Sequence, residues 1–131
     1  MKKQQKIQTQ IDVFGIDETA ATAHKINVAN GWWEDRENVN MAHPSGQLHV
    51  ALGCIALIHT ELSEAVEALR KHDPETWTDH TKKDTFIREL AGAKIRIDDL
   101  AVWMGGSIGL AMQAELENNA TRGIRHGGKR A

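Results

Sequence analysis

The chain has 131 residues and a formal net charge of −2, with a single cysteine. This length fits one domain, residues 1–131, and the charge gives no general case for nucleic acid as a partner. One cysteine excludes an internal disulfide and a cysteine-built zinc site. No apolar run reaches the roughly 18 residues of a membrane span, and the polar first residues do not resemble a signal peptide. We therefore expect a soluble, cytoplasmic protein that does not bind membranes.

The first 14 residues are expected to be irregular, with at most a short strand where polar and apolar residues alternate from Ile7 to Val13. A first helix is predicted from an N-cap at Asp17 to about Asn30. Aspartate is a preferred N-cap residue, and Gly31 is a natural stop.

Two adjacent tryptophans, Trp32 and Trp33, follow this helix directly. Their position favours a core anchor, because indole is largely apolar with one polar atom. An indole can also form the wall of a base pocket, and Trp33 is therefore a candidate substrate-binding residue. Residues 34–46 have the composition of a loop, and loops in such positions often carry binding residues.

A long second helix is predicted from about Gln47 to Lys71, where the sequence before Pro74 ends it. Apolar residues recur along it in alternating steps of about three and four, as on the inner face of a bundle helix. His59 interrupts this seam and is expected to be a hydrogen-bonded core histidine, since no second histidine lies one turn away. The seam consists of Leu48, Leu52, Ile55, Leu62, Val66 and Leu69.

Two further helices are predicted, from about Asp84 to Met104 and from an N-cap at Ser107 to about Asn119. Four helices with short connections indicate an all-α fold of the four-helix bundle type. A basic, glycine-rich tail, residues 122–131, follows. The expected inner faces are Phe86, Leu90, Ala93, Ile97, Leu100 and Met104 on the third helix, and Ile108, Ala111, Met112 and Leu116 on the fourth.

Carboxylates also occur on faces that are otherwise apolar. On the second helix Glu61 and Glu64 share one face with Val50, Cys54, Leu57 and Ala68, and this face should be buried. On the third helix Glu89 shares a face with Gly92, Arg96, Asp99 and Trp103. Buried carboxylates are costly unless a positive group, most simply a metal ion, neutralises them.

These spacings predict that Glu61, Glu64 and Glu89 converge on one hard cation. The alternative is that they lie on a solvated face with helix ion pairs, as most charge runs do. Asp99 lies roughly 15 Å along the axis from Glu89, too far to share that ion, at about 1.5 Å per residue. We expect Asp99 to pair with Arg96 or with another subunit.

The order of motifs from about residue 24 to the end resembles that of the MazG-like, all-α nucleoside triphosphate pyrophosphohydrolases. The motifs are Gly-Trp-Trp-Glu-Asp at 31–35, His-Thr-Glu-Leu-Ser-Glu-Ala-Val-Glu-Ala-Leu-Arg at 59–70, Arg-Glu-Leu-Ala-Gly-Ala-Lys-Ile-Arg-Ile-Asp-Asp-Leu at 88–100, and Asn-Asn-Ala-Thr-Arg-Gly-Ile-Arg-His-Gly-Gly-Lys-Arg at 118–130.

The resemblance implies Mg²⁺-dependent cleavage, with Mn²⁺ as a possible substitute, of a ribo- or deoxynucleoside triphosphate into the monophosphate and pyrophosphate. It implies a homo-oligomer, a dimer or a tetramer. Glu61 and Glu64 match the family's Glu-x-x-Glu motif, and Glu89 matches the glutamate of its Glu-x-x-Asp motif. These three are thus the implied metal ligands and catalytic residues. Residues matching the family's tail, suited to holding phosphates or the neighbouring subunit, are Asn119, Arg122, Arg125, His126 and Lys129.

Two positions depart from the family pattern. Gly92 stands where the second motif has its aspartate, and Glu115 stands where relatives tend to carry a lysine. Glycine supplies no ligand and weakens a helix interior by about 1 kcal/mol relative to alanine. The alternative function is therefore a non-catalytic nucleotide-binding or oligomer-forming member of the same fold.

Overall fold

The computed structural model describes residues 7–36 and 43–122. This part of the chain is helical and contains no strand, so the prediction of an all-α chain is confirmed and the possible strand at Ile7–Val13 is wrong. None of its helices is both long and apolar enough to cross a membrane. The helices are α1 (Val13–Ala29), α2 (Pro44–Lys71), α3 (Phe86–Trp103) and α4 (Ile108–Thr121), with short 3-10 turns η1 (Glu34–Arg36) and η2 (Pro74–Thr76).

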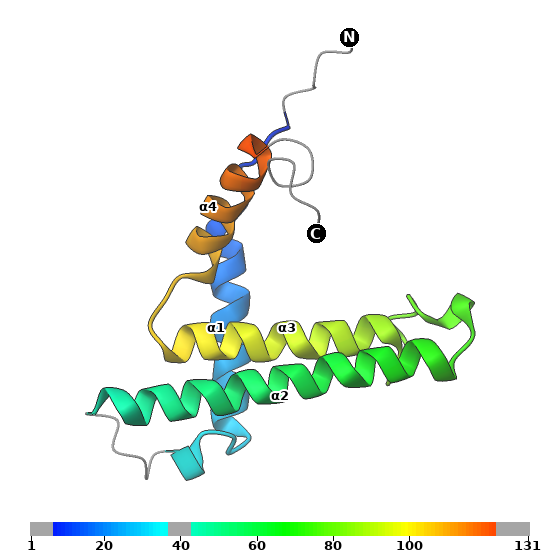
Figure 1. Cartoon of the computed structure of the whole chain (residues 1–131), viewed down its shortest axis with the longest axis horizontal. Helices are drawn as coiled ribbons and strands as arrows, with labels where there is room; N and C mark the ends of the chain where they lie inside the picture. The colour runs from blue at the N-terminus through cyan, green and yellow to red at the C-terminus, as the bar shows by residue number, and fades with distance from the viewer. Residues whose placement is uncertain (1–6, 37–42, 123–131) are drawn as a thin grey trace.

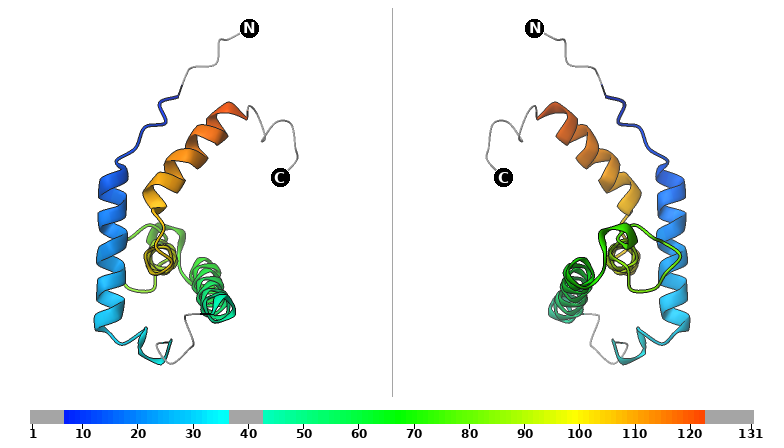
Figure 2. Two further views of the ribbon diagram at one scale, coloured as in Figure 1. Left: turned by 90° about the vertical axis from the view of Figure 1, so that its left-hand side faces the viewer. Right: turned by 90° about the vertical axis from the view of Figure 1, so that its right-hand side faces the viewer.

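The four helices do not run side by side as one bundle. α2 and α3 form an antiparallel hairpin, and α1 crosses it on the α3 side (Figures 1 and 2). α4 then turns away from the hairpin and packs along the first half of α1. In Figure 2, α3 is seen end-on between α1 and α2. α3 is therefore the central helix of the chain.

The start of α1 differs from the prediction. Asp12, not Asp17, is its N-cap, and its carboxylate accepts a hydrogen bond from Gly15 N at 3.0 Å. Asp17 instead accepts hydrogen bonds from Ser107 Oγ at 2.6 Å and Gly109 N at 2.8 Å. The predicted N-cap at Ser107 is confirmed. Asp17 thus fastens the start of α4 to the side of α1.

The leucine-rich seam of α2 faces outward in the single chain. Five of its members are between 42% and 55% exposed, and His59 is exposed as well, so its expected place in the core is wrong. The predicted burial of the face that carries the carboxylates is confirmed in part: Val50, Cys54 and Ala68 are buried and Glu61 is half-buried, but Glu64 is exposed. Small residues allow the close approach of α2 to α3: the buried residues of α2 include Ala65 and Ala68. The exposed five are Leu48, Leu52, Ile55, Leu62 and Val66.

α3 shows the same reversal. Leu90, Ile97 and Met104 are exposed, whereas Ala93, Asp98 and Asp99 are buried. The expected inner face of this helix is therefore only partly buried, because Ala93 belongs to it but Leu90, Ile97 and Met104 do too. Asp98 is buried with a partner, because Lys94 Nζ donates to it at 2.9 Å.

α4 packs through small and polar residues rather than through its predicted apolar face. Ala111, Met112 and Leu116 are exposed, while Gly109 is buried. The half-buried Gln113 accepts a hydrogen bond from Ile11 N at 2.9 Å and donates one to a carbonyl in the segment before α1. These contacts orient α4 along α1.

Candidate metal centre

Three glutamates meet between α2 and α3. Glu61 and Glu64 lie one turn apart on α2, and Glu89 lies in the first turn of α3, which runs antiparallel to it. Each offers a carboxylate oxygen within 4.8 Å of those of the other two. The predicted convergence of these three residues is therefore confirmed. Thr85 sets the start of α3 as its N-cap, which places Glu89 at this position.

The cluster concentrates negative charge in a partly enclosed place. Burial raises the pKa of Glu89 above its ordinary value of 4.5, and a hydrogen bond with Glu64 and the charges of Glu64, Glu61 and Asp84 raise it further. Such crowded carboxylates are stabilised when a cation is shared among them. Three carboxylates within reach of one ion are the hard oxygen ligands that Mg²⁺ and Mn²⁺ take. The residues present thus fit a hard divalent cation.

One oxygen of the cluster already has a positive partner. Arg96 Nε donates to Glu61 Oε1 at 2.8 Å, and the guanidinium lies 4.8 Å from the ring centroid of Trp32. Both charged side chains of this pair are mostly buried. Because the contact uses Oε1, it fixes the orientation of the Glu61 carboxylate and lowers the net charge of the cluster.

Asp99 does not pair with Arg96, contrary to the prediction. It is buried and accepts three hydrogen bonds, at 2.6 Å from His24 Nδ1, 2.8 Å from Asn27 Nδ2 and 3.0 Å from Trp33 Nε1. These donors come from α1 and from the turn after it. Asp99 therefore holds α1 and this turn against α3, next to the metal centre but not in it.

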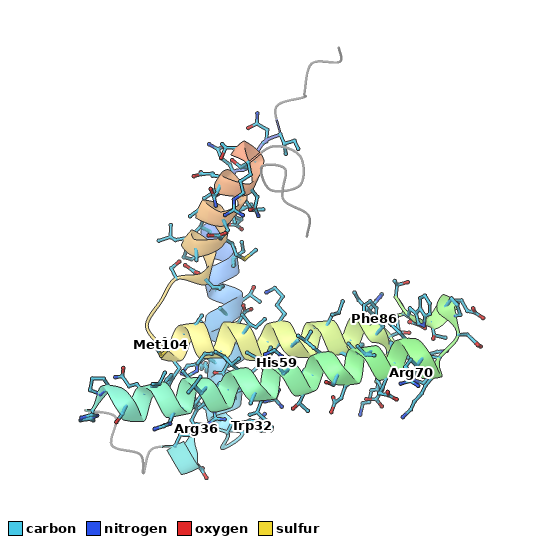
Figure 3. All side chains as sticks on the ribbon, in the orientation of Figure 1. Trp32, Arg36, His59, Arg70, Phe86 and Met104 are labelled. Carbon is cyan, nitrogen blue, oxygen red and sulfur yellow. The ribbon has the colours of Figure 1, made fainter. Side chains whose placement is uncertain are left out.

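Trp33, the candidate substrate-binding indole, is a core residue. It is only 6% exposed, stacks on Trp103 with ring centroids 5.0 Å apart, and packs with Val50 and Cys54. The accessible indole is Trp32, which is 47% exposed and lies with Arg36 beside the end of α1 (Figure 3). Sequence reasoning could not separate two adjacent tryptophans in an irregular turn.

A pocket of about 170 Å³ adjoins the cluster, and its lining includes the Gly92 position. A Cβ at Gly92 would lie 3.0 Å from Glu61 Oε2, and the only other atom within 4 Å belongs to the same carboxylate. A side chain there would therefore enter the cluster, as expected for the missing ligand of the Glu-x-x-Asp motif. The pocket is lined by Asn27, Trp32, Glu61, Gly92, Ile95 and Arg96.

The two described members of the predicted tail set, Asn119 and Arg122, do not lie at the glutamates in the single chain. Asn119 is exposed near the end of α4, and Arg122 is the C-cap of that helix. This end of α4 points away from the α2–α3 hairpin (Figures 1 and 2). Arg125, His126 and Lys129 lie outside the described residues.

Comparisons of the chain with protein-family models, with curated proteins and with solved structures found no match. The order of motifs in the sequence and the geometry of the three glutamates are therefore the features of the chain that point to a function.

Proposed function

We propose that the chain is a Mg²⁺-dependent nucleoside triphosphate pyrophosphohydrolase that converts a ribo- or deoxynucleoside triphosphate into the monophosphate and pyrophosphate. The observation that carries this proposal is the meeting of Glu61, Glu64 and Glu89, whose oxygens lie within 4.8 Å of one another. The three come from the two motifs that resemble the metal-binding motifs of MazG-like enzymes. Their convergence supports a shared cation more strongly than the spacing of carboxylates along a single helix does.

In this proposal Glu61, Glu64 and Glu89 hold the cation. A bound Mg²⁺ supplies charge neutralisation, polarisation of a phosphoryl oxygen and a lowered pKa of an attacking water. Arg96 keeps Glu61 in place through the 2.8 Å contact. One glutamate of the three accepts a proton from that water.

The nucleoside end of the substrate occupies the pocket beside Glu61. Trp32 offers an accessible aromatic surface there, and Asn27 and Ile95 provide a polar and an apolar wall. Stacking on an indole is tolerant of base identity, because every base has a π-face. The base pocket assigned to an indole by sequence thus involves Trp32 in place of Trp33.

The proposed enzyme is a homo-oligomer. The outward α2 seam and the exposed Leu90, Ile97 and Met104 of α3 leave more apolar surface than a soluble monomer usually exposes. A second copy of the same chain covers such a self-complementary face most simply. The basic tail of the neighbouring copy is then the candidate source of Asn119, Arg122, Arg125, His126 and Lys129 at the site.

Two observations favour the alternative, a non-catalytic nucleotide-binding or oligomer-forming protein. Gly92 offers no ligand atom to the cluster, and Arg96 already neutralises part of the charge on Glu61. Both reduce the attraction for a divalent cation. Retention of all three glutamates in one place favours catalysis.

Product analysis separates the two functions. Purified protein is incubated with each common nucleoside triphosphate and Mg²⁺ or Mn²⁺, and the products are resolved by ion-exchange chromatography. We expect equal amounts of monophosphate and pyrophosphate, and no turnover by Glu64→Gln. Substrate binding without turnover would favour the non-catalytic function. Formation of diphosphate and orthophosphate would contradict the proposed reaction.

A further inference from the structure

A second pocket lies at the other side of the glutamate cluster. It has a volume of about 230 Å³ and is lined by Lys83, Asp84, Arg88 and Glu89. It shares Glu89 with the cluster, just as the Trp32 pocket shares Glu61. The α3 residues that line the Trp32 pocket, from Gly92 to Arg96, follow Glu89 in the helix. Those that line this second pocket lie at or before Glu89, at the start of the helix.

Local structure holds the residues of this pocket in place. Asp84 has a φ of 63°, a left-handed conformation in the turn just before α3. The next residue, Thr85, is buried and donates through Oγ1 to Asp79 O at 3.0 Å. Arg88 Nη1 donates to His80 O, also at 3.0 Å. The turn and the first helical residues are thus tied to the segment before them, with Arg88 at the pocket.

The two cations of the pocket are exposed and form no direct ion pair in the described part of the chain, although Asp84 and Glu89 line the same pocket. Neither Lys83 nor Arg88 forms an ion pair there, whereas the neighbouring cation Lys82 acts on the carboxylate of Asp79. Two unpaired cations therefore lie beside a cluster of carboxylates that fits a divalent cation. Phosphate oxygens complement both kinds of positive charge, those of the side chains and that of the metal.

We propose that this pocket binds the terminal phosphates of the substrate, with Lys83 and Arg88 as their ligands. This inference rests on the proposed function and fixes the direction of the nucleotide. The base lies toward Trp32 and Ile95, and the phosphates that leave as pyrophosphate lie toward Lys83 and Arg88.

The test uses pyrophosphate itself, measured by titration calorimetry in the presence of Mg²⁺. We expect Lys83→Gln and Arg88→Gln each to weaken binding by about tenfold, the cost of losing one charged hydrogen bond. The matched control is Lys82→Gln, which removes the same charge from the adjacent residue and should change the affinity less than about twofold, as for a screened surface charge. Thermal unfolding of the variants checks that each remains folded.

The outcomes separate this inference from the proposed function. Equal effects of Lys82→Gln and Lys83→Gln, or no effect of Lys83→Gln and Arg88→Gln, would overturn the phosphate pocket even if the protein hydrolyses nucleotides. Wild-type protein that does not bind pyrophosphate would overturn it as well. Pyrophosphate binding with the expected variant pattern, but without hydrolysis, would support the pocket and reject the enzyme.

Discussion

Gly92 is the position at which one side chain would alter the metal centre most directly. Its nearest neighbour is the Glu61 carboxylate, which Arg96 holds, so a larger residue requires that carboxylate to shift by a few tenths of an ångström. No backbone of another helix lies within 4 Å of the added Cβ. We expect Gly92→Asp to add a fourth carboxylate, tighten Mg²⁺ binding and raise pyrophosphohydrolase turnover. It should also recover some helix propensity, a few tenths of a kcal/mol.

Gly92→Asn is the matched control, because it has the shape of aspartate without the charge. Melting temperatures with and without Mg²⁺, together with turnover, distinguish the variants. A lower melting temperature for Gly92→Asp with an unchanged response to Mg²⁺ would reject the account of a lost ligand.

The protonation of Glu89 makes the stability of the folded chain depend on pH. Burial, the hydrogen bond with Glu64 and the neighbouring charges raise its pKa in the folded chain above 4.5. The folded chain therefore keeps this proton at pH values where the unfolded chain has lost it, and stability falls as pH rises from 4.5 through the raised pKa. Without divalent cations, Glu89→Gln should flatten this part of the profile and raise the melting temperature at neutral pH.

The control for Glu89 is Glu67→Gln, an exposed glutamate of α2 that pairs with Arg70 and Lys71. With a chelator present, the melting temperature of this variant should change with pH as that of the wild type does. If the melting temperature of Glu89→Gln changed with pH in parallel with that of wild type, the cluster would not disfavour the ionised form of Glu89.

Among single residues, the sequence predicted that the three glutamates lie together, but not the partners around them. Spacing rules compare residues of one helix, so they paired Arg96 with Asp99. In the structure Arg96 reaches across to Glu61, and Asp99 is taken by donors from α1 and the following turn. Those contacts depend on how α1 crosses α3, which no local pattern specifies.

At the scale of elements, the contact of α4 with α1 depends on Gly109. A Cβ there would lie 2.7 Å from Val13 O and 2.9 Å from Asp17 Oδ1, so the helices would have to separate. We expect Gly109→Ala to lower the free energy of unfolding by about 1 to 3 kcal/mol, the usual cost of overpacking.

The control is Gly53→Ala in α2, where a Cβ would meet nothing within 4 Å. It should stabilise the protein by about 0.5 to 1 kcal/mol, since alanine favours the helix. Denaturant unfolding measures both variants, and equal effects of the two would contradict the close approach at Gly109.

Helix positions were more predictable than helix orientations. The predicted ends of α2, α3 and α4 lie within a few residues of the observed ones, because proline, the glycine pair at 105–106 and the Ser107 cap mark them locally. The packed faces were predicted only in part, since α2 and α3 each carry a leucine-rich face and a face of small and charged residues, and both were expected to be buried. Hydrophobicity alone favours burial of the leucine-rich face. Within one chain, however, the small residues of the other face let α2 and α3 approach more closely.

At the scale of the whole molecule, the outward leucine-rich face of α2 predicts self-association. We expect light scattering at micromolar concentration to give a dimer or a tetramer. Leu52→Glu or Val66→Glu should shift the protein toward monomer, because each places a charge on the exposed apolar face. Ser63→Glu, at another exposed position of α2, should leave the mass unchanged. A monomeric wild-type protein would contradict this prediction.

In the proposed function Glu61, Glu64 and Glu89 act together on one divalent cation. The most direct measurement is Mg²⁺ titration calorimetry of the wild-type protein and of three single glutamate-to-glutamine variants, with Glu67→Gln as the control on the same helix. We predict saturable binding by wild type and Glu67→Gln, and loss of most of the affinity in Glu61→Gln, Glu64→Gln and Glu89→Gln alike. Binding that is absent from the wild type, or that persists unchanged in these three variants, would contradict the account.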